Sequence, residues 1–312
     1  MGAPPAGEDR AAVDRGGSTA DRRPGGPVAS VRGTDAPDRP FAVDGVGVGW
    51  RPEIAGWVAD VSDLGFCEVI AESIAPAGPP RGVVDLRARG VPVIPHGIRL
   101  SLGGAEPLEP ARVAQLAACA DVLGAPLVSE HIAFVRAGGR EAGHLLPVPR
   151  TREALDVLAG NVARLSAELT VPVALEVIAA LFDWPDDELT EPEFLAAVGD
   201  RTGALLLLDV ANVYANAVNR AQDPRAVLDA ILDRVPADRI GYVHVAGGSA
   251  RHDEAGYYHD THTDPVPDAV LGLLAHLVER APGVPVLLER DGGYPPAAVL
   301  TAELAAIAEA AR

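Results

Sequence analysis

Short apolar runs alternate with longer alanine- and leucine-rich stretches along almost the whole chain from residue 43 onward. Continuous apolar runs separated by helical stretches are typical of parallel strands whose outer face is covered by helices. Eight β/α units in 312 residues predict an α/β fold of the (β/α)8 TIM barrel type. The expected strands are residues 46–50, 66–71, 91–96, 127–131, 173–177, 204–210, 240–245 and 284–289.

An open, doubly wound sheet is the competing architecture. Its dinucleotide-binding form requires a GxGxxG turn between the first strand and a helix. Here the glycines of GVGVG (residues 45–49) are followed by Trp50, Arg51 and Pro52, so a dinucleotide site is unsupported.

The expected helices begin at capping residues or early prolines, as helix starts should. They include residues 110–123, 151–169, 191–198, 223–234 and 268–280, whereas residues 98–108 show no helical pattern. Residues 1–40 contain almost no large apolar side chain, so burial cannot offset the entropy lost on ordering. We therefore expect a disordered tail over 1–40 and a single barrel domain over 41–312.

The composition excludes several classes of function. All 26 basic residues are arginine, which removes Schiff-base lysine chemistry and the phosphate-binding lysine of Walker motifs. A formal charge of −18 argues against a nucleic-acid groove. No apolar run is long enough to span a bilayer and no signal segment is evident, so we expect a cytoplasmic protein without a membrane partner. Cys67 and Cys119 stand alone in apolar runs, which fits buried thiols in a reducing compartment.

Polar residues with metal-binding side chains stand at nearly every predicted strand end. Barrel enzymes carry their active sites at these ends. Crowding so many carboxylates into one low-dielectric mouth is costly unless cations neutralise them, so the pattern predicts a site for more than one metal. In chain order the residues are Arg51, Glu53, Glu68, Glu72, His96, Glu130, His131, Glu176, Asp209, Asn212, His244, Glu289 and Asp291.

The segment at residues 240–266 is the most histidine-rich part of the chain. After an apolar run it supplies His252, His259, Asp260, His262 and Asp264. A polar surface loop is the simplest interpretation of such a tract. Mixed imidazole and carboxylate ligands without thiolates suit iron, manganese or zinc, and spacing alone does not choose among them.

Seven motifs in order resemble those of a known family. The chain is similar to the multinuclear non-heme iron-dependent oxidases, the family of MbnB and TglH, from about residue 45 to residue 294. The motifs are PHGIRLSLGG (95–104), SEH (129–131), LPVPRTREAL (146–155), LDVANVYANA (208–217), YVHVAGG (242–248), HDTHTDPV (259–266) and LLERDGG (287–293).

The resemblance implies a xylose-isomerase-like barrel with two or three irons at its mouth. It implies an oxidase that uses O2 to modify a residue, often cysteine, of a ribosomally made precursor peptide. It also implies a separate partner protein that captures the leader peptide. Carried over by motif, the metal ligands are His96, Glu130, Glu176, Asp209, His244, Asp260, His262 and Glu289.

The catalytic candidates are Asp209, Asn212, Arg51 and Glu53. Asn212 is expected beside the metals. Arg51 is expected to pair either with a substrate carboxylate or backbone or, equally, with a neighbouring acid at a strand end. His131 ranks below Glu130 as a ligand, because side-chain alternation along the strand points the two residues in opposite directions.

The chain departs from the family pattern at two positions. Family members commonly carry a histidine after the first strand, where this chain reads RPEI with Glu53, and HLAGH at the seventh, where it reads HVAGG with Gly248. We therefore expect two metals and a third position that is weak or missing. Glu53 remains able to ligate, and His252 or His259 is placed to compensate.

Two other classes of function fit the same residues. One is a redox-inert metal enzyme on the same barrel, either a sugar isomerase or epimerase or a phosphodiesterase, since fold alone does not separate it from an oxidase. The other is a non-catalytic metal-binding or peptide-binding protein.

Overall fold

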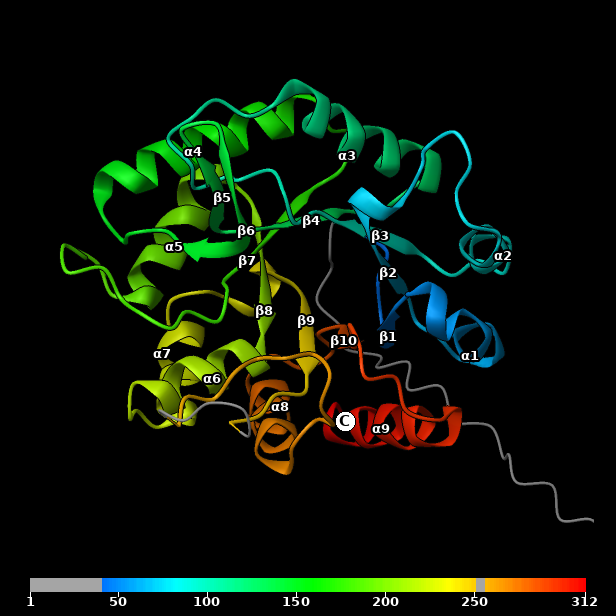
Figure 1. Ribbon diagram of the computed structural model, residues 1–312. Helices are drawn as coiled ribbons and strands as arrows, with labels where there is room; N and C mark the ends of the chain where they lie inside the picture. Colours follow the sequence, from blue (N-terminus) through cyan, green and yellow to red (C-terminus); the bar gives the residue numbers. More distant parts are fainter. Residues whose placement is uncertain (1–40, 251–255) are drawn as a thin grey trace, which may run out of the picture.

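Eight parallel strands close into a barrel in the computed structural model, which describes residues 41–250 and 256–312 (Figure 1). Each strand pairs with the next along the chain, and the last pairs with the first through Val46 and Val286. The predicted TIM barrel is confirmed, whereas the expected tail lies outside the described residues. The strands are β1 (Val46–Gly49), β2 (Cys67–Ile70), β3 (Val93–His96), β4 (Val128–His131), β7 (Val173–Glu176), β8 (Leu205–Asp209), β9 (Ile240–Ala246) and β10 (Val286–Glu289).

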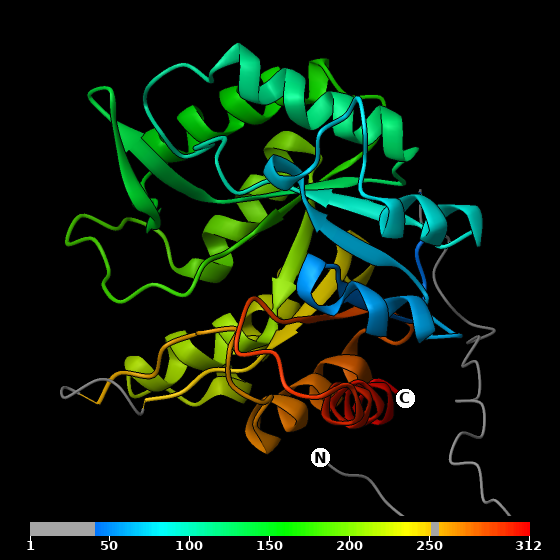
Figure 2. The ribbon, with the colours of Figure 1, turned by 45° about the vertical axis from the view of Figure 1, so that its right-hand side comes forward.

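Helices surround the barrel (Figures 1 and 2). Five match expected stretches: α3 (Pro110–Leu123), α4 (Arg152–Ala167), α5 (Glu191–Thr202), α7 (Pro224–Leu232) and α8 (Asp268–Arg280). The other helices are α1 (Ala55–Asp60), α2 (Arg81–Ala88), α6 (Val210–Asn219) and α9 (Ala297–Ala310), with short 3-10 turns at Pro52–Ile54, Ala71–Ser73 and Ala237–Arg239. Over the described residues, none of the helices has the length and apolar character needed to cross a membrane.

Helix α6 begins without any intervening loop. The side chain of Asp209, the last residue of β8, accepts hydrogen bonds from the backbone N–H groups of Ala211 and Asn212. An aspartate in this position caps a helix by satisfying two N–H groups that lack a partner in the first turn. The strand β8 therefore passes directly into helix α6 at Asp209.

An antiparallel hairpin interrupts the repeat after β4. It consists of β5 (Ala133–Ala137) and β6 (Arg140–Pro147), joined at Gly138 and Gly139, whose φ angles are 59° and 69°. Positive φ at both central residues is the geometry of the tight turns that match strand twist. The hairpin, the segment after β7 and the segment after β9 project on the same side of the molecule (Figure 2).

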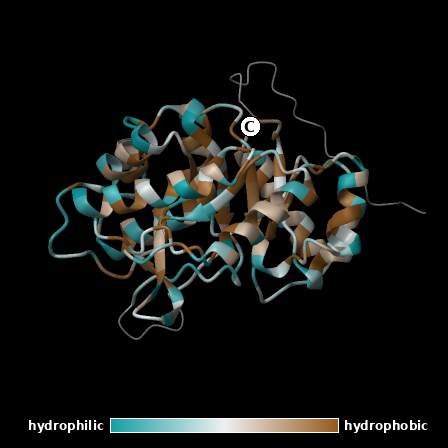
Figure 3. Ribbon diagram, turned by 90° about the horizontal axis from the view of Figure 1, so that it is seen from above, coloured by the Kyte–Doolittle hydropathy of each residue, from teal (hydrophilic) through white to brown (hydrophobic). Residues whose placement is uncertain are grey.

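The barrel interior contains a layer of apolar side chains below the mouth. Figure 3 shows the hydrophobic strands at the centre and the hydrophilic residues mainly on the surrounding helices and loops. This layer separates the polar mouth from the opposite end of the barrel, as interior side-chain layers do in such folds. Its members are Phe66, Ile94, Leu127, Ala174, Leu205, Leu207, Tyr242 and Leu287, with Phe41 and Val43 packed on the same cluster.

We expect Leu127→Ala to lower the free energy of unfolding by about 2–5 kcal/mol, because Leu127 is fully buried in this layer and its removal leaves a cavity. The matched control is Leu181→Ala, whose side chain is 50% exposed and whose loss should change the value by less than about 0.5 kcal/mol. Urea denaturation of the metal-free protein measures both. Equal effects would show that the layer is not a packed core.

Candidate metal centre

The residues that follow the apolar layer form a polar layer at the carboxyl ends of the strands. On β3, Ile94 belongs to the apolar layer and His96 lies two residues further along; Leu287 and Glu289 on β10 are related in the same way. Side chains two apart on a strand share a face, so these polar groups project into the barrel above the apolar ones. The polar members on the strands are Glu68, His96, Ser129, His131, Glu176, Asp209, His244 and Glu289, all buried.

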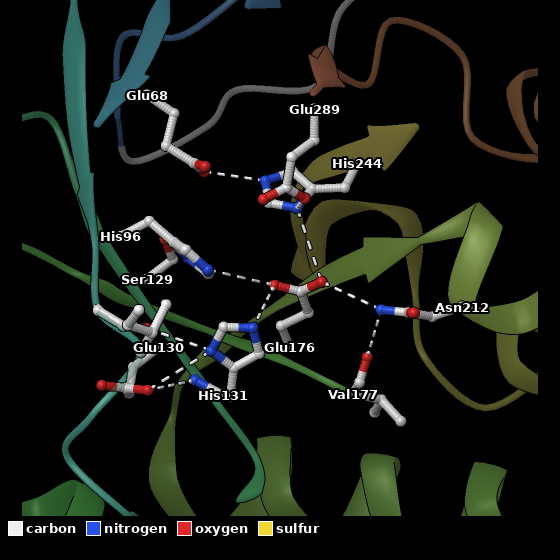
Figure 4. Close-up of polar contacts among 12 residues, drawn as sticks. Glu68, His96, Ser129, Glu130, His131, Glu176, Val177, Asn212, His244 and Glu289 are labelled. Carbon is white, nitrogen blue, oxygen red and sulfur yellow. Dashed lines mark hydrogen bonds and ion pairs between the residues drawn. The ribbon is translucent and has the colours of Figure 1, made fainter. Parts of the chain in front are cut away.

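Glu176 is the centre of this layer. His96 Nε2 lies 3.7 Å and His131 Nε2 lies 3.4 Å from its Oε2 atom. His244 Nδ1 lies 3.6 Å from Oε1, and the Asn212 side-chain amide donates to the same oxygen at 3.3 Å. Figure 4 shows these side chains converging on the Glu176 carboxylate from different elements.

A second group of ligands is completed by the segment that follows β9. His262 Nδ1 lies 3.6 Å from Glu289 Oε2, and the same oxygen lies 2.9 Å from His244 Nδ1. His262 Nε2 lies 2.5 Å from Asp260 Oδ2. His262 has a φ of +54°, in the left-handed region, and its backbone is held by Gly247 and Asp291. This strained backbone position directs the imidazole toward the strand ends.

Four groups of three side chains place their ligating atoms within 4.8 Å of one another among the described residues. Glu176, Asp209, His244 and Glu289 each belong to two of them, so the groups adjoin and offer positions that could hold more than one ion. The groups are His96, His131 and Glu176; Glu68, His244 and Glu289; Glu176, Asp209 and His244; and Asp209, His262 and Glu289. We call these eight residues the buried cluster.

The buried cluster contains polar atoms that the protein itself leaves without hydrogen-bond partners. Glu176 Oε2, Asp209 Oδ2 and His244 Nδ1 are such atoms. Asp260 Oδ1, outside the cluster, is also buried without a hydrogen-bond partner. Orphaned buried polar atoms are rare because they forfeit their solvation. Imidazole and carboxylate donors without thiolate are a suitable set for iron, manganese or zinc. The residues present therefore fit a centre of divalent ions.

The pKa values of two residues in the buried cluster are raised in part because negative charge is concentrated there. Burial raises the pKa of Asp209 to about 8, and repulsion from Asp260 and Glu176 adds to the rise. Burial alone would lower the pKa of His131, but the Glu176 and Glu130 carboxylates raise it to about 9. Without a metal, the cluster therefore holds protons near neutral pH that a bound cation would displace.

Comparison with known proteins identifies the family. Residues 45–312 match the family model described as "RiPP precursor modification enzyme MbnB/TglH/ChrH". The chain belongs to this family. A UPF0276 protein of Streptomyces avermitilis is 51% identical over 270 residues, which are 84% of this chain and only 54% of that relative's length. A UPF0276 protein of Chromobacterium violaceum is 37% identical over 243 residues, covering 78% of this chain and 86% of the relative.

The solved structures support the architecture of this MbnB/TglH/ChrH family member. Endonuclease IV from Thermus thermophilus aligns with a TM-score of 0.58 and 22% identity, over 85% of this chain and 99% of that chain. A D-allulose 3-epimerase from Methylomonas aligns with a TM-score of 0.53 and 15% identity, over 88% and 96%. At these identities the comparison shows the barrel fold alone.

Among the described residues, His131 belongs to one of the candidate ligand groups, whereas Glu130, which the sequence interpretation preferred, belongs to none. Ser129 and His131 share the inward face of β4, and Glu130 lies between them on the other face. Both Glu130 carboxylate oxygens accept backbone N–H groups, from His131 at 2.9 Å and from Leu100 at 3.1 Å. The alternation rule was correct, but the inward position was assigned to the wrong residue.

The remaining predicted residues divide between the site and its edge. Asn212 is buried beside Glu176 and also donates to the Val177 carbonyl. Arg51 is buried at the end of β1, where its Nε donates to Asp291 at 2.8 Å, and its guanidinium lies 3.6 Å from Glu289. Glu53 is exposed on the turn that follows and belongs to none of the ligand groups, so the expectation that it can ligate is not supported.

The space at Gly248 is closed. A Cβ atom there would lie 2.4 Å from the His259 carbonyl oxygen and 2.7 Å from the Tyr258 ring. His259 is in none of the ligand groups of the described residues, and His252 lies outside those residues. Glu53 and Gly248 stand at the two positions where family members commonly carry additional histidines, so neither position supplies an imidazole in this chain.

Glu68, Ser129 and Tyr242 complete the site, and the sequence interpretation did not place them in it. Glu68 stands at a predicted strand end but is not among the metal ligands that the family motifs imply. The signal that finds them is the two-residue spacing from the apolar layer: Glu68 follows Phe66, and Ser129 follows Leu127. Tyr242 is itself a member of the apolar layer and presents its hydroxyl to the layer above.

We expect His131→Ala to reduce the amount of metal bound per chain, because it removes an imidazole from one ligand group. Glu130→Gln should retain the metal and lower the free energy of unfolding by about 1–3 kcal/mol, since one backbone N–H loses its charged acceptor. Elemental analysis and denaturant unfolding measure the two effects. Loss of metal in Glu130→Gln together with full metal in His131→Ala would reverse the assignment.

Proposed function

We propose that this protein is an iron-dependent oxidase that uses O2 to modify a residue, often cysteine, of a ribosomally synthesised precursor peptide. The observation that carries the proposal is the set of adjoining ligand groups, which share Glu176, His244, Asp209 and Glu289. A shared carboxylate is suited to hold two ions close together. Membership of the MbnB/TglH/ChrH family supports this choice among the chemistries that such a site allows.

In this proposal His96, His131 and Glu176 hold one iron, and Glu176, Asp209 and His244 hold the other, so that Glu176 is the shared carboxylate. His262 and Glu289 adjoin the second group through Asp209 and His244. Bound iron would supply the redox chemistry by which electrons pass from the peptide residue to O2. The protein contributes fixed ligands on several strands. Asn212 orients the Glu176 carboxylate through its amide, and Arg51 fixes Asp291 beside Glu289.

The buried position of the ligands also serves the reaction. Glu176 and Asp209 are each 2% exposed, so bulk water has little access to them. A dry site strengthens electrostatic interactions and protects reactive species from side reactions. Because the Glu53 and Gly248 positions add no imidazole, we propose two irons rather than three.

The proposed substrate is a precursor peptide, and we propose that a separate protein captures its leader. The peptide would approach the mouth on the side where the β5–β6 hairpin and the segments after β7 and β9 project (Figure 2). Exposed apolar side chains occur on two of these segments, at Leu181, Phe182 and Tyr257. Exposed apolar groups beside a site are the kind of surface that binds peptide.

Metal analysis of protein purified without oxygen, combined with iron Mössbauer spectroscopy, tests the metal part of the proposal. We expect about two irons per chain with magnetically coupled signals after oxidation, as in a two-metal site. Zinc or manganese at high occupancy, with little iron after iron supplementation, would favour the redox-inert isomerase, epimerase or phosphodiesterase. Protein without firmly held metal would contradict both enzymatic functions.

The peptide part is tested by co-expression with a short cysteine-containing peptide encoded beside this gene. We expect a mass change in the peptide that requires air, iron and an intact site, so His244→Ala should abolish it. His276→Ala is the matched control, because His276 lies on α8 and contacts Asp229 of α7, away from the buried cluster. Turnover of a sugar in anaerobic manganese buffer, with an unchanged peptide mass, would overturn the oxidase.

A further inference from the structure

A chain of hydrogen bonds runs behind the buried cluster and joins two of its imidazoles. His96 Nδ1 lies 2.9 Å from the Ser129 hydroxyl, which lies 2.7 Å from the Tyr242 hydroxyl. The Tyr242 hydroxyl lies 2.6 Å from Glu68 Oε2, and His244 Nε2 lies 2.9 Å from the same oxygen. We call these five residues the relay. They come from β2, β3, β4 and β9, and each is at most 2% exposed.

The number of available protons fixes the direction of the relay. Tyr242 has one hydroxyl proton, and the Glu68 carboxylate is a stronger acceptor than a serine hydroxyl, so Tyr242 donates to Glu68. Ser129 then donates to Tyr242 and accepts from His96, whose Nδ1 must carry a proton. His244 likewise donates to Glu68 from Nε2. One carboxylate therefore terminates the hydrogen bonds of both imidazoles.

This direction decides which nitrogen of each neutral imidazole carries the free lone pair. It is Nε2 in His96, which lies 3.7 Å from Glu176 Oε2, and Nδ1 in His244, which lies 2.9 Å from Glu289 Oε2 and 3.6 Å from Glu176 Oε1. A lone pair facing a carboxylate at such distances is repulsive, and a cation between them turns the repulsion into coordination. The relay thus prepares both imidazoles to bind metal on the side of Glu176.

We infer that Ser129, Tyr242 and Glu68 act together as positioning residues that fix the tautomers of two metal-binding histidines, His96 and His244, through one shared carboxylate. The inference rests on the proposed metal centre and goes beyond it by assigning roles to three residues that need not touch a metal. Partners of this kind orient a ligating imidazole and raise its basicity. The linkage also makes the two histidines interdependent, since a change in Tyr242 reaches both.

The competing role for Glu68 is that of a metal ligand, because it forms a ligand group with His244 and Glu289 and its Oε1 atom has no partner. The two roles predict different consequences for Tyr242 and Ser129. If Glu68 only ligates, removal of the Ser129 hydroxyl should leave metal binding unchanged. If the relay orients the imidazoles, the same removal should weaken binding.

The test uses Co2+, whose visible absorption reports ligand geometry, added to the full metal-free chain without oxygen. In Tyr242→Phe and Ser129→Ala we expect the same number of Co2+ ions per chain, dissociation constants raised about 10- to 100-fold, and altered visible bands. In the double variant the dissociation constant for Co2+ should rise by less than the product of the two single fold-increases, because both substitutions break the same chain of hydrogen bonds. Ser101→Ala is the matched control, a buried serine whose hydroxyl accepts the Val135 N–H outside the relay.

Unchanged dissociation constants and spectra in folded Tyr242→Phe and Ser129→Ala would overturn the inference, as would equal changes in Ser101→Ala. Loss of one whole Co2+ ion in Glu68→Gln, with normal binding in Tyr242→Phe, would make Glu68 a ligand instead. Wild-type protein that binds no Co2+ would overturn both the relay and the proposed oxidase. Normal relay effects on Co2+ without any peptide oxidation would overturn the oxidase alone.

Discussion

Burial of negative charge is the constraint on which the rest of this structure depends. Glu68, Glu176, Asp209 and Glu289 are each at most 4% exposed, and they face one another across the mouth of a single barrel. An ionised carboxylate removed from water costs several kcal/mol unless positive charge or hydrogen bonds compensate. Histidines supply part of that compensation, and the orphaned oxygens of Glu176 and Asp209 show that it is incomplete. Bound cations would supply the compensation that this cluster lacks, and its residues are compatible with metal binding.

The apolar layer makes this charged site possible. Phe66, Ile94, Leu127 and Leu287 close the barrel directly below it. On β3 and β10 a packed core residue is followed two positions later by a residue of the buried cluster, His96 after Ile94 and Glu289 after Leu287. Neighbouring strands hold those residues through the backbone ladder, as in the pairing of Asp209 with His244. The ligands are therefore fixed by secondary structure rather than by loops, which suits a site that must hold several ions at set separations. Asp260 and His262 are the exceptions, and their segment is tied to Gly247 and Asp291 by backbone hydrogen bonds.

The sequence predicted the barrel because its signal is repeated eight times, and each apolar run is too continuous to be a half-exposed strand. It predicted that polar residues from many strand ends come together at one mouth, but not always which residue of a pair faces inward. Counting in steps of two residues from the apolar layer would have included Glu68 after Phe66. The same count from Leu127 would have selected first Ser129 and then His131, and passed over Glu130. That count requires knowing which of two adjacent apolar residues faces the barrel axis. In a strand buried on both faces, residue type does not reveal this.

Other features had no comparable local signal. The closure of the space at Gly248 depends on Tyr258 and His259, which are held at this point by the bridge between Ser249 and His259. The relay depends on side chains from four strands that meet only in the closed barrel. The fold shared with an endonuclease and an epimerase therefore fixes where ligands can stand, whereas the choice of residues at a few interior positions determines what they can hold. In this chain, those interior positions also provide the Ser129–Tyr242–Glu68 connection, through which two histidines from opposite parts of the strand order depend on a single buried carboxylate.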